Sequence, residues 1–326
     1  MQQLMAAMVE EGCEYCFMEV SSHATHQKRV QGINFKGAIF TNITLDHLDY
    51  HKTFAEYIKA KKLFFDHLDK EAFAVINIDD KNGNIMVQNT KAKVTTFSIG
   101  KMADYQCKVL ESHFDGMLLE IDQTEIWTRF IGHFNASNLL AVYATAINLG
   151  QDKDEVLTKI SNLKPVQGRF EIIRSTDGKF GIVDYAHTPD ALKNVLKAIN
   201  EIRQNTEQVI TVVGCGGDRD KSKRPIMAQE AIAQSNKVIL TSDNPRTEDP
   251  EQIIKDMETG VKKQDQYKVL SIVNRREAIK TATMLAQPGD IILIAGKGHE
   301  TYQEVNGVKH HFDDKEEIMN FFGIKE

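Results

Sequence analysis

Cysteine and proline are scarce in this sequence. Among 326 residues there are four cysteines and six prolines. Four scattered cysteines are too few for the disulfide framework of a small secreted protein, so we expect the reducing cytoplasm as the compartment. Cys13 and Cys16 form a C-x-x-C pair, but no second pair or nearby histidine completes a zinc site. We therefore expect ordinary packing at this pair.

An excess of positive charge and a long apolar run are also missing. The chain has 40 Lys and Arg residues against 46 Asp and Glu residues, for a net charge of −6. Nucleic-acid-binding domains present a basic face to phosphates, so we expect no nucleic-acid partner. No apolar run approaches the ~18 residues of a membrane span. The acidic Glu10 and Glu11 are atypical of a signal peptide.

The length of the chain favours two domains, because single hydrophobic cores stop growing near ~250 to 300 residues. With 41% hydrophobic and 26% charged residues, the composition is that of an ordinary globular protein. We expect a monomer that acts on small molecules.

The first half of the chain alternates helical and strand-like runs. Helices are expected at 1–11 and 53–68, and strands at 15–20, 37–41 and 73–78. This alternation is typical of a mostly parallel α/β sheet. From 106 to 131, short alternating strands around Asp115-Gly116 predict a small antiparallel sheet packed beside the parallel one. A helix is expected at 135–149, ended by Gly150.

A second α/β series begins after Pro165, and we place the domain boundary there, giving domains 1–165 and 166–326. The expected strands are 181–184, 209–213, 237–241, 267–272 and 290–295, with helices beginning near Pro189, Pro225, Pro250 and Arg275. Five strands joined by crossover helices predict a doubly wound, Rossmann-like sheet.

Polar or glycine-rich residues follow the expected strands in both halves. They are 19–23, 41–49, 184–187, 214–219, 243–246 and 296–300. In doubly wound sheets ligands bind beyond the carboxyl ends of the strands, so we expect a ligand site there. Glu19 and His47, at neighbouring strand ends, could hold Mg²⁺. The alternative is that each is an ordinary capping or core residue.

Several of these motifs together resemble the Mur ligase family, the ATP-dependent amino-acid ligases of peptidoglycan synthesis. The motifs are Met18–His23, Asp46–His51, Ala60-Lys61, Gly132–Asn138, Gly168–Glu171, Asp184–Asp190 and the three later strand-end motifs. The resemblance spans the whole chain. It implies a truncated central ATPase domain, a mostly parallel sheet plus a small antiparallel sheet, followed by a doubly wound C-terminal domain.

The resemblance also implies an activity. ATP would phosphorylate the D-glutamyl carboxylate of UDP-N-acetylmuramoyl-L-alanyl-D-glutamate, and meso-2,6-diaminopimelate would then attack the acyl phosphate. The substrates are therefore small molecules, with ATP and Mg²⁺ as cofactors. A folate polyglutamate or cyanophycin synthase is the more distant alternative, against which the motifs at 243–246 and 296–300 argue.

For the first half, the resemblance implies a metal site and a nucleotide-sugar site. Glu19 and His47 would ligate Mg²⁺, and Lys61 would be a carbamylated catalytic lysine that ligates a second Mg²⁺. A carbamate turns a cation into a group with oxygen ligands for a hard metal. On the residues alone, Lys61 is typical of a solvated helix face together with Lys59 and Lys62, and only the resemblance favours the carbamate. Contacts to the UDP-sugar dipeptide would come from Ser21, Gln27 and Arg29.

For ATP, the resemblance implies contacts from Asn138, Arg169 and Asp184, with His187 as a catalytic residue near the phosphates. Asn138 would face the adenine. Either Asn135 or Asn138 could instead be the N-cap of the helix that begins there.

For diaminopimelate, the resemblance implies a site made of Arg219, Asp243, Asn244, Pro245, Arg246, Gly296 and Glu300. Arginine forks suit carboxylates, and Glu300 could hold an ammonium group. Lysine would leave Arg246 unpaired, which disfavours it as a substrate. The alternative is that Asn244-Pro245 is only a turn and Arg246 a surface residue.

One expected motif is missing from the sequence. ATP phosphates are normally cradled by a glycine-rich loop ending in Gly-Lys-Thr or Gly-Lys-Ser, and no such loop occurs here. The nearest run, Gly296–His299, has the wrong spacing. We therefore expect a truncated ligase, and the alternative to an active enzyme is a non-catalytic binding fragment.

Overall fold

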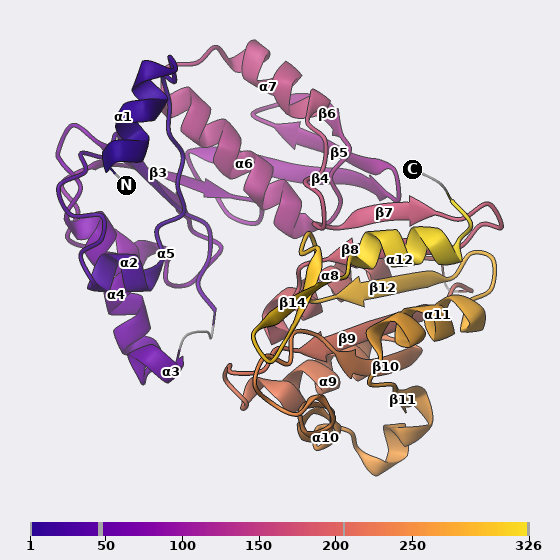
Figure 1. The fold of residues 1–326 in the computed structure, drawn as a ribbon. Coiled ribbons are helices and arrows are strands. Elements are labelled where there is room, and N and C mark those ends of the chain that lie inside the picture. The colour runs from indigo at the N-terminus through magenta and orange to yellow at the C-terminus, as the bar shows by residue number, and fades with distance from the viewer. Residues whose placement is uncertain (1, 45–47, 205, 325–326) are drawn as a thin grey trace.

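The computed structural model describes residues 2–44, 48–204 and 206–324, which form two six-stranded sheets flanked by helices (Figure 1). The first sheet has the strand order β1-β2-β3-β4-β5-β6. Its strands are β1 (Gly37–Phe40), β2 (Phe73–Asn77), β3 (Lys93–Ser98), β4 (Tyr105–His113), β5 (Gly116–Ile121) and β6 (Thr124–Thr128). The first four strands run parallel, and β4 to β6 form an antiparallel meander.

The sequence suggests a separate antiparallel sheet packed beside the parallel one, but the structure has the antiparallel strands within the same sheet. β4 pairs in parallel with β3 at Tyr105 and Gln106 before it turns into the meander, so all six strands share one sheet. The expected strands at 37–41 and 73–78 are confirmed, whereas β3 was missed. Buried Val75, Phe97 and Leu119 pack against α6 from one face.

Helices of the first half are α1 (Gln2–Glu10), α2 (Ser22–His26), α3 (Leu48–His51), α4 (Phe54–Asp66), α5 (Gly83–Met86), α6 (His133–Asn148) and α7 (Lys153–Asn162). The predicted helices α1, α4 and α6 are confirmed. The expected asparagine cap of α6 is wrong, because the cap position is Gly132 with a φ of 89°. The side chain of Asn135 instead donates to the Ile131 carbonyl at 2.8 Å.

The strand expected at 15–20 does not form. Residues 13–21 have no regular secondary structure and belong to no ladder, and Tyr15 and Phe17 are 52% and 71% exposed. The next strand in the chain, β1, lies at the sheet edge and pairs only with β2 among the described strands. Alternating apolar residues make a strand only where a neighbouring strand supplies hydrogen bonds, and 13–21 has none within the described residues.

The second sheet has the order β11-β10-β9-β12-β8-β7. Its strands are β7 (Glu171–Arg174), β8 (Phe180–Asp184), β9 (Val209–Cys215), β10 (Lys237–Ser242), β11 (Val269–Ser271) and β12 (Ile291–Ala295). All five predicted strands and their parallel arrangement are confirmed. The sequence missed the antiparallel edge strand β7 and the hairpin of β13 (Tyr302–Val305) and β14 (Val308–His311).

Five α-helices and one 3₁₀ helix accompany this sheet. They are α8 (Pro189–Ile202), α9 (Lys223–Gln234), α10 (Pro250–Glu258), η1 (Lys263–Lys268), α11 (Arg275–Leu285) and α12 (Asp314–Phe321). Thr188 caps α8 and Asn274 caps α11, each accepting a backbone N–H three residues on. α8 and α9 pack on one face of the sheet, and α11 and α12 pack on the other.

The two halves touch through aromatic side chains. Phe114, in the β4–β5 turn, stacks on Phe180 of β8 with ring centroids 4.7 Å apart, and Phe134 of α6 lies 6.2 Å from Phe170. The exact division at 165 and 166 remains a prediction. In the described ranges, every helix is too short or too polar to cross a membrane.

Candidate functional site

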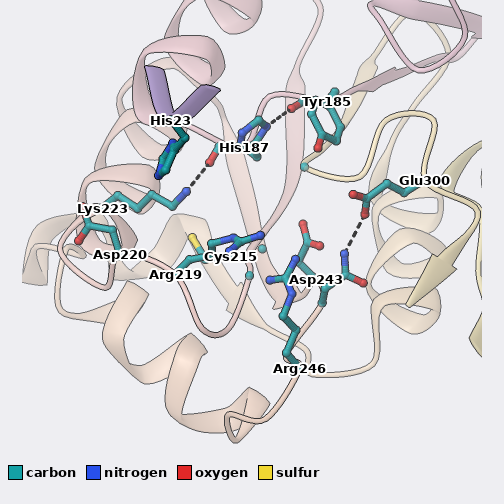
Figure 2. Close-up of a pocket in the computed structure, with 14 residues that line it drawn as sticks. His23, Tyr185, His187, Cys215, Arg219, Asp220, Lys223, Asp243, Arg246 and Glu300 are labelled. Atoms are coloured by element: carbon teal, nitrogen blue, oxygen red, sulfur yellow. Dashed lines mark hydrogen bonds between the residues drawn. The ribbon is translucent and has the colours of Figure 1, made fainter. Parts of the chain in front are cut away.

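A cavity of about 340 Å³ opens at the carboxyl ends of four strands of the second sheet (Figure 2). The strands are β8, β9, β10 and β12, so the cavity spans the point between β9 and β12 where the strand order reverses. Such switch points are where open α/β sheets bind ligands. The lining residues are His23, Tyr185, His187, Gly214, Cys215, Gly216, Arg219, Asp220, Lys223, Asp243, Asn244, Arg246, Gly296 and Glu300.

Six of the seven predicted diaminopimelate residues line this cavity, and Pro245 does not. The Pro245 carbonyl instead lies where a side chain on Gly217 would stand, 2.0 Å from the ideal Cβ. Pro245 therefore shapes the turn that carries Asn244 and Arg246 rather than facing the cavity.

Two arginines converge on one side of the cavity (Figure 2). A Cβ on Gly216 would lie 2.9 Å from Arg246 Nη1 and 3.8 Å from Arg219 Cγ, so both side chains pass close to this glycine. Arg219 makes no hydrogen bond or ion pair with the part of the chain that the structure describes. Its guanidinium is thus available to an anionic ligand.

Arg246 is held in place by its backbone as well as its side chain. It has a φ of 51°, its N–H donates to the Glu304 carbonyl at 3.0 Å, and its Nη1 donates to the Gly217 carbonyl at 2.8 Å. Its Nε lies 3.7 Å from a carboxylate oxygen of Glu304. The β13–β14 hairpin therefore fixes the arginine at the cavity, which disfavours a purely surface role.

Asp243 contributes a buried carboxylate. The residue is 7% exposed, and its carboxylate accepts no hydrogen bond from the described residues. Gly296, with a φ of 121°, leaves room for this group, because a Cβ there would lie 2.5 Å from Asp243 Oδ2. Because Asp243 lines the cavity and no described donor occupies its carboxylate oxygens, this position is suited to a cationic ligand group.

A network of charges fixes the loop after β9. Glu248 pairs with Arg224 at 2.8 Å and Lys221 at 3.1 Å, and accepts the Asp218 N–H at 2.6 Å. The hydrogen bond from Arg224 is the main reason that the pKa of Glu248 is lowered to about 2. The loop bearing Arg219 is therefore tied to the turn bearing Arg246.

The predicted ATP residues Arg169 and Asp184 lie beside the cavity. Asp184 Oδ2 accepts the Phe170 N–H at 2.7 Å, and burial raises the pKa of this carboxyl to about 6, partly offset by that hydrogen bond and by Arg169. The Arg169 guanidinium lies 4.6 Å from the Tyr185 ring centroid, a cation–π distance. His187 lines the cavity, with Nδ1 2.9 Å from the Tyr185 carbonyl oxygen.

The predicted residues of the first half are not gathered in this cavity. Glu19 is exposed in the segment 13–21, Lys61 is half-buried on α4, and Asn138 is exposed on α6. His47 lies outside the described residues. Among the residues that are described, no group of three or more His, Cys, Asp and Glu side chains could hold a metal. The metal set therefore stays a prediction.

The predicted nucleotide-sugar residues lie on and after α2. The Ser21 hydroxyl caps that helix by accepting the Ala24 N–H at 3.1 Å. Gln27 donates to the Tyr50 hydroxyl at 3.2 Å, and Arg29 is exposed. Their neighbour His23 lines the cavity, so this segment borders the site from the first half (Figure 2).

Seven cavity residues were not predicted as site residues: His23, Tyr185, Gly214, Cys215, Gly216, Asp220 and Lys223. His23 and Tyr185 lie within motifs that the sequence analysis identified, so these motifs could have indicated them as site residues. Lys223 donates to the His187 carbonyl at 3.3 Å, a contact between two strand-end loops that no local pattern marks.

Both halves of the chain match family models of Mur ligase domains. Residues 1–146 match the family described as "Mur ligase middle domain", and residues 168–298 match "Mur ligase, glutamate ligase domain".

Curated relatives named "UDP-N-acetylmuramoyl-L-alanyl-D-glutamate--2,6-diaminopimelate ligase" are similar over nearly the whole chain. The protein from Phocaeicola vulgatus is 60% identical over 99% of this chain and 66% of its own length. The one from Geobacillus thermodenitrificans is 43% identical over 97% of this chain and 66% of its own length. A solved structure with the same name is 40% identical, with a TM-score of 0.63, over 98% of this chain and 67% of that one. The chain thus spans about two thirds of the length of these relatives.

Proposed function

This chain belongs to the Mur ligase family, and on that premise we propose that it takes part in the ATP-dependent addition of meso-2,6-diaminopimelate to UDP-N-acetylmuramoyl-L-alanyl-D-glutamate. The observation that carries the proposal is one cavity whose lining includes the guanidinium groups of Arg219 and Arg246 and the carboxylates of Asp243 and Glu300. The names of the relatives support the same reaction.

The charges of the cavity complement diaminopimelate at neutral pH. That amino acid has two carboxylates and two ammonium groups. We assign the carboxylates to Arg219 and Arg246 and the ammonium groups to Asp243 and Glu300. Lysine lacks the distal carboxylate and would leave a guanidinium desolvated and unpaired, which is how polar sites discriminate strongly.

The chemistry that we propose has two steps. The D-glutamyl carboxylate attacks the γ-phosphorus of ATP, forming an acyl phosphate and releasing ADP. An amine of diaminopimelate, having lost a proton, then attacks the acyl carbon, and inorganic phosphate leaves. Arg169, Asp184 and Asn138 are assigned to ATP, and His187 to the reacting phosphate. Two of these assignments are supported by position, because His187 lines the cavity and Arg169 lies over the ring of the lining residue Tyr185.

Metal ligation is proposed for Glu19, His47 and a carbamylated Lys61. The donor chemistry supports it only in part: carboxylate and carbamate oxygens suit Mg²⁺, whereas an unmodified lysine does not. Bound Mg²⁺ would offset the charge on the transferred phosphoryl group. Ser21, Gln27 and Arg29 are assigned to the UDP-sugar dipeptide, because they flank His23 at the edge of the cavity.

We further propose a cytoplasmic monomer. Burial raises the pKa of Cys107 and Cys215 to about 12, so both thiols stay protonated and unreactive, which suits packing rather than disulfide formation. Sedimentation velocity would contradict the monomer if it gave a dimer at micromolar concentration.

The substrate assignment is tested by calorimetric titration of the chain with meso-diaminopimelate and with L-lysine. We expect lysine to bind about 100-fold more weakly, because one guanidinium stays unpaired. Arg246→Met should weaken diaminopimelate binding by a similar factor. The control is Arg174→Met, an exposed arginine on β7. Equal binding of lysine, or an unchanged Arg246→Met variant, would contradict the assignment.

The ligase step is tested separately, by amino-acid-dependent ADP release with ATP, the dipeptide substrate and diaminopimelate. A second candidate function is an amino-acid-binding module. Diaminopimelate binding without ADP release would select the module.

A further inference from the structure

Lys297 follows the cavity residue Gly296, yet its side chain does not line the cavity. It is 0% exposed, although lysine is rarely fully buried unless it is paired. Its ammonium donates to Asn244 Oδ1 at 3.3 Å, to Glu300 Oε2 at 3.4 Å, and to the Tyr302 carbonyl. An ammonium has three N–H groups, so these three acceptors satisfy it completely.

This ammonium fixes the orientation of the Asn244 amide. Oδ1 of Asn244 accepts from Lys297 and also from the Glu304 N–H at 2.9 Å. With two donors at its oxygen, the amide must present its NH₂ group on the other side. There Nδ2 donates to Glu300 Oε2 at 2.8 Å, the contact drawn at Glu300 in Figure 2.

The two oxygens of Glu300 consequently differ. Oε2 receives both donors, Asn244 Nδ2 and Lys297 Nζ. Oε1 accepts no hydrogen bond from any residue that the structure describes, and Glu300 lines the cavity. Oε2 is therefore fixed by hydrogen bonds within the protein, and Oε1 is available to a ligand.

An apolar side chain in place of Lys297 would remove one donor from each of three acceptors. Asn244 Oδ1 would keep only the Glu304 N–H, and Glu300 Oε2 would keep only Asn244 Nδ2. Charge-assisted hydrogen bonds hold a carboxylate more firmly than neutral ones, and removing a single partner strands the others. The Asn244 amide and the Glu300 carboxylate would then be held only by the Glu304 N–H and by each other, with no cation to fix them. A cation at this position is therefore needed to hold Asn244 and Glu300, although Lys297 itself does not line the cavity.

We propose that Lys297 is a positioning residue: it holds Glu300 and Asn244 so that Glu300 Oε1 receives an ammonium group of the amino-acid substrate. The inference rests on the proposed function, because it assigns the mechanism by which the same cavity recognises an amine.

The test compares two ligands on the full chain by calorimetry. They are meso-diaminopimelate and 2-aminopimelate, which keeps both carboxylates and lacks one amino group. We expect the unaltered chain to prefer diaminopimelate by about tenfold or more, the order of one charge-assisted hydrogen bond. In Lys297→Met the preference should fall below about threefold while thermal unfolding stays cooperative.

Two comparisons separate positioning from a general structural role. Lys309→Met is the matched control, since Lys309 lies over the same Tyr302 ring, 3.9 Å from its centroid, but is exposed. Its preference should be unchanged. Adding Lys297→Met to a Glu300→Gln chain should cause no further loss of preference, because the effect passes through Glu300.

If Lys297→Met does not fold, Lys297→Gln is measured instead, and the same ratio of affinities decides. An unchanged preference in the folded variant would overturn the inference and leave the proposed function standing. An unaltered chain that binds neither ligand would overturn the proposed function itself.

Discussion

The two sheets differ in how firmly they hold the residues that follow their strands. In the second sheet, β9, β10 and β12 each have a neighbour on both sides, and the residues after them meet in one cavity. In the first sheet, β1 is an edge strand and residues 13–21 join no ladder. A strand-end motif thus becomes a site only where the strand itself is anchored.

Buried ionic pairs add to the anchoring of the second sheet. Arg275 and Asp314 are both fully buried and pair at 2.7 Å, and Arg275 also donates to the carbonyl of Ala295 at 3.0 Å. This bond lies directly before Gly296, at the floor of the cavity. In the first half, α1 buries none of its side chains among the described residues, so nothing comparable holds the segment that follows it.

The largest expected effect comes from breaking that anchor. Arg275→Met should destabilise the chain by about 3 to 5 kcal/mol, because it leaves the Asp314 carboxylate buried and unpaired. The measurement is the free energy of unfolding in urea. The neighbouring Arg276→Met should cost less than about 1 kcal/mol, since Arg276 is exposed. Equal losses of unfolding free energy in the two variants would show that the buried Arg275–Asp314 pair does not anchor the second sheet.

A smaller effect is expected at the cavity itself. Gly296→Ala should weaken diaminopimelate binding about 100-fold, because the added methyl group would displace the Asp243 carboxylate. Gly289→Ala is the control: its φ is 93°, but its nearest neighbour would be 3.7 Å away and it lies outside the cavity. Similar binding losses in both variants would show that backbone strain, not the carboxylate, is responsible.

The pH dependence of stability sharpens the account at Asp184. Its folded pKa is raised to about 6 from 3.8, so between about pH 4 and 6 the folded state keeps a proton that the unfolded state has lost. Relative to Asp184→Asn, the chain should therefore lose stability, on the order of 2 kcal/mol, as the pH rises through this window. Urea unfolding at several pH values measures it.

Asp177 gives the opposite slope. A hydrogen bond from Ser175 lowers the pKa of this exposed carboxyl. Relative to Asp177→Asn, the chain should gain stability as the pH rises to about 4.

The Asp184 prediction has its own contradicting outcome. If the difference in unfolding free energy between the chain and Asp184→Asn did not change with pH, burial would not perturb the pKa of Asp184.

The smallest expected effect concerns the first half. Glu19→Gln and Arg29→Met should change diaminopimelate affinity by less than about twofold, because both residues are exposed and neither lines the cavity. Calorimetric titration checks this. A tenfold loss in either variant would mean that the residues predicted for the metal or the nucleotide sugar also contribute to amino-acid binding.

The sequence predicted the second sheet well for a physical reason. Its central strands are fully buried runs of valine and isoleucine, and prolines mark the starts of three of the helices between them. Of the strands it missed here, the two of the hairpin are short and polar. β13 and β14 contain Glu304, Lys309 and two histidines, and neither has a buried face. No apolar period could indicate them.

For the site, proximity followed from topology, but side-chain contacts did not. Arg219, Asp243 and Glu300 were expected near one another because residues after parallel strands meet at one edge, whereas their assignment to the amino acid came from the family resemblance. The burial of Lys297 could not be predicted, since a lysine between two glycines is typical of an exposed loop. Nor could the role of His23, which comes from the other half of the chain.

A crystal structure of the chain with meso-diaminopimelate tests the central claim most directly. The account predicts the ligand in the cavity of the second sheet, with one carboxylate on the Arg246 guanidinium and one ammonium on Glu300 Oε1. A ligand bound elsewhere, or one whose carboxylates avoid both Arg219 and Arg246, would contradict it.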